Sequence, residues 1–386
     1  LELAGPRRNL YFDPRMTVCA IVTCGGICPG INDVIQSIVL TAHNVYGVAS
    51  VVGIRYGLRG FIDTYGYGTV PLSPASVATI HELGGTILGT SRGPQPPEKI
   101  VAALHRMQIN TLFVIGGDGT MKAASEIYRQ VLAEGYPMSV IGIPKTIDND
   151  INFVPRSFGF DTAVEEAASI IRCAHTEAQC VANGIGIVKL MGRESGFIAA
   201  QATIATKHVD FTLVPEFSFH LHGEGGLLPA LERRLAEQGY AVIVVAEGAG
   251  QDLVSASSVC DASGNKILGD ISTLLREEIA AYLNDRGIGF SFKFIDPSYT
   301  IRSVRANSND GVYCSHLGKH AVHAAMSGRT GMVVAEIMDH FVHVPLEFVT
   351  RKRRRMPLHS DLWRALQEST GQGRFLDMGP AAGDSL

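Results

Sequence analysis

Two aspartates separated by one asparagine form the part of the sequence best suited to chemistry. Asp148, Asn149 and Asp150 end the segment PKTIDND, which follows directly on an apolar run. Repulsion between two carboxylates this close must be offset by a cation or by a proton. Phosphoryl transfer to an alcohol requires a carboxylate beside the attacking hydroxyl and metal between the phosphates. We therefore predict that Asp148 is a general base and that Asp150 supports a metal ion. The alternative is a solvent-exposed Asx turn.

A glycine-rich segment, GGDGT at residues 116–120, suggests a site for phosphate groups. Adjacent glycines leave backbone N–H groups free to face a phosphate, and the N-terminus of a following helix adds partial positive charge. Asp118 would face the same phosphates, which only a bridging Mg²⁺ would make favourable. The alternative is an ordinary turn from strand to helix with a capping residue. A similar turn at Gly25 and Gly26, in TCGGICPG, is suited to covering a nucleotide triphosphate.

Five short apolar runs must position these loops. They are rich in Val and Ile and continuous rather than alternating, which is typical of parallel strands covered on both faces. The runs are TVCAIVTCGG, NTLFVIGGDG, SVIGIPKT, GIGIVKLMG and YAVIVVAEG. Helical patterns lie between them, such as MKAASEIYRQVLAEG and FDTAVEEAASIIRCAH. This alternation predicts an α/β protein with doubly wound sheets, in which ligands bind beyond the carboxyl ends of the strands.

The composition narrows the class of protein. A chain of 386 residues that is 46% hydrophobic is expected to form two packed domains. A net charge of −4 provides no overall attraction for nucleic acid or an anionic membrane. We expect neither a secretory signal nor a membrane span.

The cysteines are scattered, as in a cytosolic enzyme with reduced thiols, and we expect Cys24 and Cys28 to be small packed residues rather than zinc ligands. The seven are Cys19, Cys24, Cys28, Cys173, Cys180, Cys260 and Cys314.

Six motifs, in order and spacing, give the sequence a family resemblance. TCGGICPG, GGTILGTSRG, GGDGT, PKTIDND, VKLMGRESGFIA and YTIR resemble 6-phosphofructokinase over roughly residues 17–356. The details are similar to the plant-type and kinetoplastid ATP-dependent branch, since the short bacterial enzymes carry PGTIDND in the corresponding loop. Two other hypotheses are a different small-molecule kinase that shares GGDGT, such as an NAD or lipid kinase, and a catalytically silent subunit that binds effectors.

The resemblance implies a fold, a reaction and partners. We expect two doubly wound Rossmann-like α/β domains with mostly parallel sheets and the active site in the cleft between them. The nucleotide-binding domain would be residues 17–160 plus about 303–350, and the sugar-phosphate-binding domain 161–302 plus about 351–386, after an N-terminal extension at 1–16. The implied reaction is the glycolytic transfer of the γ-phosphoryl group of ATP, with Mg²⁺, to the 1-hydroxyl of fructose 6-phosphate, giving fructose 1,6-bisphosphate and ADP. The implied enzyme is cytoplasmic, allosteric and a homotetramer or homodimer, without nucleic-acid or membrane partners.

The resemblance also implies residue roles. Asp148 would deprotonate the 1-hydroxyl and Arg92 would neutralise the transferring phosphoryl group. The implied catalytic residues are Asp148, Arg92, Thr146 and Arg193. The implied nucleotide contacts are Gly25, Arg92, Gly117, Asp118, Gly119, Thr120 and Lys145. The implied substrate contacts are Thr146, Ile147, Asp148, Met191, Gly192, Arg193, Glu247, Lys293, Tyr299 and Arg302. The implied metal residues are Asp118 and, through water, Asp150.

One alignment and two departures from the family pattern bear on the shared site. Lys293 aligns with an arginine that the family supplies from a neighbouring subunit, and a second phosphate-binding arginine falls at Gly184. Arg305 stands where proline is expected.

Two further positions bear on the phosphoryl donor, because pyrophosphate-using relatives carry aspartate at the position of Gly119 and lysine at that of Lys145. An aspartate would crowd and repel the α-phosphate of ATP, so Gly119 favours ATP, and a lysine can also pair with the transferring phosphate.

Two other charged patterns have simpler explanations. The run 351–355, RKRRR, resembles a nuclear address or a nucleic-acid patch, but we expect a solvated helix face or a subunit contact. His316, His320 and His323 share one helical face by their spacing, which could bind metal. Because no carboxylate or cysteine completes that set, we expect partly buried or interface histidines.

Overall fold

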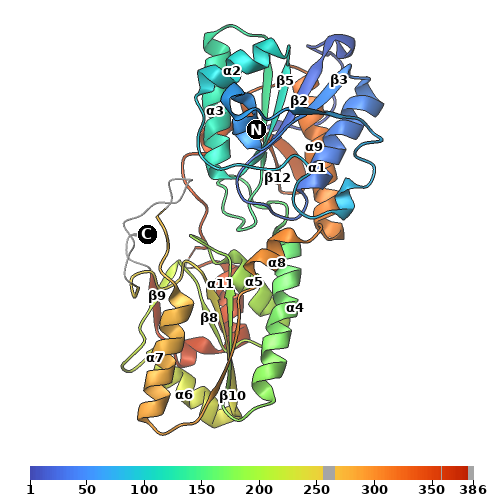
Figure 1. Cartoon of the computed structure of the whole chain (residues 1–386). Helices are drawn as coiled ribbons and strands as arrows, with labels where there is room; N and C mark the ends of the chain where they lie inside the picture. The colour runs from blue at the N-terminus through green and yellow to red at the C-terminus, as the bar shows by residue number, and fades with distance from the viewer. Residues whose placement is uncertain (255–265, 358, 381–386) are drawn as a thin grey trace. The chain divides into compact units, whose positions relative to one another are not determined.

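The computed structural model describes residues 1–254, 266–357 and 359–380, so Cys260 lies outside the described residues. Two compact units make up this part of the chain (Figure 1). Of the described residues, the first contains Leu1–Thr162 and Arg302–Arg354, and the second contains 163–254, 266–301, 355–357 and 359–380. Both units are α/β structures with mostly parallel sheets, so the predicted fold class is confirmed.

The first unit is built on an eight-stranded sheet. Its inner strands, from β12 through β6, β5 and β2 to β3, run parallel, whereas the strands at both edges are antiparallel. In spatial order the strands are β1 (Glu2–Leu3), β13 (His340–Pro345), β12 (Met332–Ile337), β6 (Ser139–Pro144), β5 (Thr111–Gly116), β2 (Val18–Thr23), β3 (Ser50–Ile54) and β4 (Thr69–Leu72).

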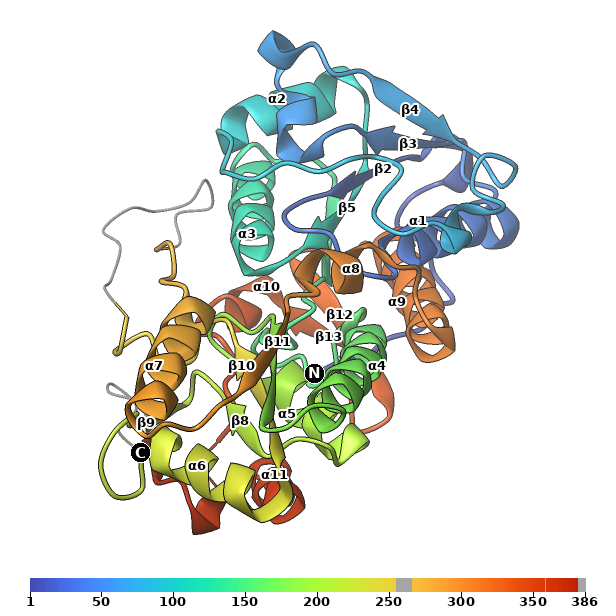
Figure 2. The same cartoon turned by 60° about the horizontal axis from the view of Figure 1, so that its bottom comes forward.

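Helices cover both faces of this sheet. Alternate residues of β2 enter two separate cores: Cys19 and Ile21 pack with α1 (Ile31–Thr41) and α9 (Ser308–Met326), and Ala20 and Val22 pack with α2 (Pro97–Arg106) and α3 (Asp118–Ala133). Figures 1 and 2 show these two pairs of helices on opposite sides of the sheet, with α9 beside α1 although the two are far apart in the sequence. A strand buried on both faces needs apolar residues at every position, which explains the continuous runs.

The second unit has a four-stranded parallel sheet in the order β11 (Ser291–Ile295), β7 (Gly184–Leu190), β10 (Tyr240–Ala246) and β8 (Phe211–Leu213). Helices α6 (Leu227–Gln238) and α7 (Ile271–Asp285) pack on one side, and α4 (Phe160–Gln179) lies on the other (Figures 1 and 2). The remaining elements are α5 (Phe197–Thr206), α8 (Ser298–Ser303), α11 (Asp361–Thr370) and the small antiparallel pair β9 (Phe217–Phe219) and β14 (Met378–Pro380).

All five predicted strands are confirmed, as β2, β5, β6, β7 and β10, and the two quoted helical patterns form α3 and α4. Cys24 and Cys28 are buried thiols, and burial raises the pKa of each to about 12, as suits small packed side chains. Among the described residues, every helix is too short or too polar to cross a lipid bilayer.

The contact between α1 and α9 depends on a glycine. A Cβ atom at Gly318 would lie 2.6 Å from Cβ of Ser37 and 3.1 Å from the backbone nitrogen of Ile38. We expect Gly318→Ala to lower the thermal unfolding midpoint, because a clash costing about 1–3 kcal/mol exceeds the gain in helix propensity of about 1 kcal/mol. Gly311→Ala, in the same helix, is the control, since its Cβ would have a closest contact of 3.4 Å. Equal midpoints for the two variants would contradict this packing.

Candidate active site

Three loops of the first unit meet at the carboxyl ends of neighbouring parallel strands. A Cβ atom at Gly25, after β2, would lie 4.0 Å from Oγ1 of Thr120, after β5. A Cβ atom at Gly26 would lie 3.9 Å from a terminal guanidinium nitrogen of Arg92. Lys145, after β6, donates from Nζ to the carbonyl oxygen of Gly26 at 2.6 Å. The structure therefore brings these predicted nucleotide contacts together.

The glycines of GGDGT differ in what surrounds them. A Cβ atom at Gly116 would lie 2.4 Å from Oγ1 of Thr120, and one at Gly117 would lie 3.3 Å from the carbonyl oxygen of Lys145. These two residues must be small for α3 to begin so close to the strand. A Cβ atom at Gly119 would meet nothing within 4 Å, so this position faces open space.

The loop that follows β6 is held by its own side chains. Thr146 donates from its hydroxyl to Oδ1 of Asp150 at 2.6 Å, and the same hydroxyl accepts from the backbone nitrogen of Asp148 at 3.2 Å. Asn149 has a φ of 56°, in the left-handed region that asparagine tolerates. Its side-chain oxygen accepts from the backbone nitrogen and hydroxyl of Ser157 at 3.0 and 3.3 Å. Asn149 and Asp150 are 5% and 9% exposed, which excludes the solvent-exposed Asx turn.

Two carboxylates share this part of the unit. Burial raises the pKa of Asp150 and the nearby charge of Asp118 adds to the effect, whereas the hydrogen bond from Thr146 and the charge of Arg353 act in the opposite direction. Asp118 is the first residue of α3, and its Oδ2 lies 2.8 Å from Nζ of Lys122 and 3.9 Å from Nε of Arg353.

This pair of carboxylates suits a magnesium ion that substrate phosphates help to hold. Magnesium binds hard oxygen ligands, typically one or two carboxylates together with phosphates and water, rather than a cage of protein side chains. Asp118 and Asp150 supply such oxygens. In the part of the chain that the structure describes, no group of three or more His, Cys, Asp or Glu side chains is arranged to hold a metal.

The basic run at 351–355 packs against the loop that follows β6. The backbone nitrogen of Arg354 donates to the carbonyl oxygen of Asp150 at 2.7 Å. Its guanidinium donates to the carbonyl oxygens of Asn149 and Pro155 at 3.2 and 3.0 Å. The run is not helical, so the expected helix was wrong, although Arg351, Lys352 and Arg355 are exposed. A run of charges looks the same whether it is solvated or packed against a distant loop, and the sequence carried no signal for this contact.

In the second unit, the predicted residues after β7 and β10 lie together. The backbone nitrogen of Glu247 donates to the carbonyl oxygen of Leu190 at 2.9 Å, and that of Gly248 donates to Gly192 at 3.1 Å. Gly192 has a φ of 132°, and a Cβ atom there would lie 2.5 Å from the carbonyl oxygen of Ser195. Met191 is buried, and the guanidinium of Arg193 donates to the carbonyl oxygen of Lys266.

Three other predicted substrate contacts lie on β11 and α8. Lys293 pairs in register with Gly186, so it sits in the middle of β11 rather than at its carboxyl end, and its Nζ lies 3.6 Å from a carboxylate oxygen of Glu177. Tyr299 is 82% exposed on α8, which also carries Arg302. Arg305 is exposed.

At Gly184, a Cβ atom would lie 2.0 Å from the carbonyl oxygen of Ala178. The arginine of the short bacterial enzymes therefore has no room at this position in the present backbone.

Two supporting residues, Ser157 and Lys189, were not singled out from the sequence, and Arg354 was noted only as part of the basic run. Ser157 and Arg354 support the loop after β6, and Lys189 pairs with Asp296 beside residues 191–193. Only Lys189 left a signal, as a single charge in an otherwise apolar run. The predicted histidines all lie on α9, where His316 and His320 stack against Phe341.

The doubly wound sheets, glycine-rich loops and paired carboxylates define an α/β phosphotransferase. The chain belongs to the phosphofructokinase family, whose sequence profile matches residues 18–325. It is 48% identical over 378 residues to the ATP-dependent 6-phosphofructokinase of Amycolatopsis methanolica, covering 96% of this chain and 82% of that protein. It is 46% identical to ATP-dependent 6-phosphofructokinase 7 of Arabidopsis thaliana, with coverage of 97% and 77%. The ATP-dependent 6-phosphofructokinase of Trypanosoma brucei brucei is also 46% identical, with coverage of 96% and 76%.

A solved structure is similar in fold. The pyrophosphate-dependent phosphofructokinase from Nitrosospira multiformis superposes with a TM-score of 0.76, covering 96% of this chain and 95% of that one, at 19% identity. At this identity the likeness concerns the arrangement of helices and strands alone. The predicted resemblance to the phosphofructokinase family, including its plant and kinetoplastid members, is confirmed.

The Asn149 side chain should be required for the stability of its loop. We expect Asn149→Ala to destabilise the protein by about 1–3 kcal/mol, because the backbone nitrogen of Ser157 loses its acceptor and the carbonyl oxygen of Pro155 loses the Asn149 amide donor. Asn149→Asp keeps the acceptor for Ser157 but loses the donor to Pro155 and adds a buried carboxylate beside Asp150, so it should also destabilise the protein. Urea unfolding of the wild type and both variants measures the difference. An Asn149→Ala midpoint equal to that of the wild type would contradict the assignment.

Proposed function

We propose that this chain is an ATP-dependent 6-phosphofructokinase, which transfers the γ-phosphoryl group of ATP to the 1-hydroxyl of fructose 6-phosphate. The observation that carries the proposal is the meeting of the loops after β2, β5 and β6, where Lys145 contacts the Gly26 carbonyl and Asp118 lies near Asp150. Membership of the phosphofructokinase family and relatives named as ATP-dependent enzymes support it. A NAD or lipid kinase would share GGDGT without the downstream motifs. A silent subunit would be expected to lack Asp148 or Asp118.

In the proposed reaction, Asp148 accepts the proton of the 1-hydroxyl as that oxygen attacks the γ-phosphorus, and ADP leaves. Thr146 orients this segment through its hydrogen bonds to Asp150 and to the Asp148 backbone. Arg92 and Lys145 supply positive charge where negative charge spreads over the transferring oxygens. The backbone N–H groups of Gly25 and Thr120 donate to the carbonyl oxygens of Ser91 and Gly117. We therefore assign the nucleotide phosphates to the N–H groups of Gly26 and of residues 117–119.

Asp118 and Asp150 would hold Mg²⁺, with Asp150 acting through water. When bound, the ion would neutralise charge on the phosphates of ATP. When the ion is not bound, the positive charges of Lys122 and Arg353 partly neutralise the Asp118 carboxylate.

We assign the nucleotide to the first unit and fructose 6-phosphate chiefly to the second. In this proposal Met191, Gly192, Arg193 and Glu247 contact the sugar, Tyr299 and Arg302 serve the 6-phosphate, and Ile147 lines the reacting end. A guanidinium can bind phosphate through two parallel hydrogen bonds, which favours Arg302 for that role. Lys293, on the edge strand β11, would serve a neighbouring subunit of a homotetramer or homodimer. The proposed location is the cytoplasm.

Asp148→Asn tests the general base. We expect turnover to fall by on the order of 10²-fold or more, while fructose 6-phosphate still binds, because the amide keeps the shape and loses the basic oxygen. Steady-state kinetics and equilibrium binding of fructose 6-phosphate measure the two effects. Asp339→Asn makes the same chemical change in an exposed turn and should leave turnover unchanged. Near-normal turnover in Asp148→Asn would remove Asp148 from the mechanism.

Gly119→Asp tests the choice of donor. The open space around Gly119 means that the variant should fold, yet its carboxylate would repel the α-phosphate of ATP. We expect the KM for ATP to rise on the order of tenfold or more, with Gly119→Ala close to wild type. Parallel assays with Mg-ATP and pyrophosphate give the comparison. A wild-type enzyme that uses pyrophosphate but not Mg-ATP would overturn the proposed donor.

A further inference from the structure

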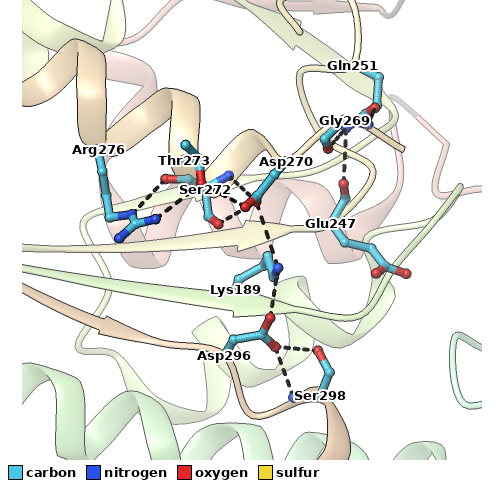
Figure 3. A network of polar contacts seen from close by, with 10 residues as sticks. All are labelled: Lys189, Glu247, Gln251, Gly269, Asp270, Ser272, Thr273, Arg276, Asp296 and Ser298. Atoms are coloured by element: carbon cyan, nitrogen blue, oxygen red, sulfur yellow. Dashed lines mark hydrogen bonds and ion pairs between the residues drawn. The ribbon is translucent and has the colours of Figure 1, made fainter. Parts of the chain in front are cut away.

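The ends of three strands in the second sheet meet around one lysine. Lys189 is the penultimate residue of β7, which lies between β11 and β10. Its ammonium group lies 2.7 Å from Oδ2 of Asp296 and 3.8 Å from Oδ1 of Asp270 (Figure 3). Asp296 directly follows β11, and Glu247, whose charge also acts on Lys189, directly follows β10. Asp296 and Asp270 therefore lie beside this cation, and Glu247 adds a negative charge in the same region.

Asp296 connects the lysine to the segment that carries Tyr299. While Oδ2 faces Lys189, Oδ1 accepts from the backbone nitrogen and the hydroxyl of Ser298 at 3.2 and 2.6 Å. Ser298 is the first residue of α8, and Tyr299 is the second. The two oxygens of one carboxylate thus fasten the start of α8 to the end of β7, next to residues 191–193.

Asp270 connects the same lysine to the loop that carries Glu247. Asp270 caps α7 by accepting from the backbone nitrogen of Ser272 at 3.2 Å. The preceding residue, Gly269, exchanges two hydrogen bonds with the side chain of Gln251, at 3.0 and 3.1 Å. Gln251 also donates to the carbonyl oxygen of Glu247 at 3.2 Å. Figure 3 shows this chain of contacts reaching from Lys189 through Asp270 toward Glu247.

The charge of Lys189 is already compensated. Partial burial opposes the charged form, but the hydrogen bond and charge of Asp296, with the charges of Asp270 and Glu247, raise the pKa of Lys189 above its usual value. Its side chain is only 21% exposed. An ammonium group among three carboxylates has little attraction left for an anionic ligand, so its geometry suits holding other groups rather than binding phosphate itself.

We propose that Lys189 is a positioning residue for fructose 6-phosphate, which sets the places of α8 and of the Glu247 loop beside residues 191–193. The inference rests on the proposed function, because it concerns the sugar-phosphate side of that site. Without the cation, Asp296, Asp270 and Glu247 repel one another, and both segments lose their common anchor.

Lys189→Met, Lys189→Arg and the control Lys207→Met test this role by steady-state kinetics. We expect Lys189→Met to raise the KM for fructose 6-phosphate about tenfold or more, while the KM for ATP changes by less than about twofold. Arginine keeps the charge and should restore most of the loss. Lys207 is exposed at the end of α5, and its replacement should change neither constant. Equal increases in both KM values, or no increase, would overturn the proposal.

A double-mutant cycle with Asp296→Asn separates positioning from direct contact with the substrate. The asparagine oxygen can still accept from Ser298, but the charge pair is lost. If the two residues act together, Lys189→Met should raise the KM for fructose 6-phosphate only slightly in the Asp296→Asn background. Fully additive effects would mean that Lys189 does not act through Asp296 and α8, and would overturn the proposal.

Amide hydrogen exchange keeps the proposal testable if the proposed function fails. If the wild type does not phosphorylate fructose 6-phosphate, the proposed function is wrong. The claim that Lys189 holds the start of α8 can still be tested, because it predicts a change in hydrogen exchange. Exchange at residues 298–303 should be faster in Lys189→Met than in the wild type or Lys207→Met. Unchanged exchange would mean that Lys189 does not hold α8, and the inference would fall independently of the reaction.

Discussion

The burial of Asp150 near a second carboxylate is the constraint on which the first unit depends. Removing a charge from water costs several kcal/mol unless partners compensate it, and a neighbouring like charge adds to that cost. The hydroxyl of Thr146 and the guanidinium of Arg353 provide part of the compensation. The loop keeps its shape through Asn149 and Ser157 and through the backbone of Arg354, which comes from a distant part of the chain. These contacts fix a cluster of oxygens that is better suited to a hydrated cation with phosphates than to an isolated protein.

In the second unit the arrangement of charges is reversed. There one cation, Lys189, lies beside the carboxylates of Asp296 and Asp270, and in our proposal it positions segments that carry predicted substrate contacts. Asp118 and Asp150 lie in the loops after the fully buried strands β5 and β6, and Lys189 lies near the end of the largely buried strand β7. Such strands have fixed positions, so the loops at their carboxyl ends begin from fixed points. Rigid sheets with charged loop ends are a physical basis for placing reacting groups accurately.

The fold was largely predictable because its main signal has a local cause. A continuous run of Val and Ile indicates a strand covered on both faces, and this rule found β2, β5, β6, β7 and β10. The chemistry of Asp118 and Asp148 was also suggested locally, by residue type and position after a strand. The contacts that hold these residues in place were not predictable, because they depend on which distant segments of the chain meet in the fold. Arg354 contacts a carbonyl 205 positions away in the sequence, and nothing in the run RKRRR distinguishes that contact from a solvated one.

The most direct measurement is the identity of the product. Purified protein is incubated with Mg-ATP labelled at the γ-phosphorus and with fructose 6-phosphate, and the phosphorylated sugar is analysed by phosphorus NMR and mass spectrometry. The account predicts that the label appears on the 1-position of fructose 1,6-bisphosphate, with one ADP formed for each labelled sugar. Label that remains in ATP, or that appears on a different acceptor or position, would contradict it.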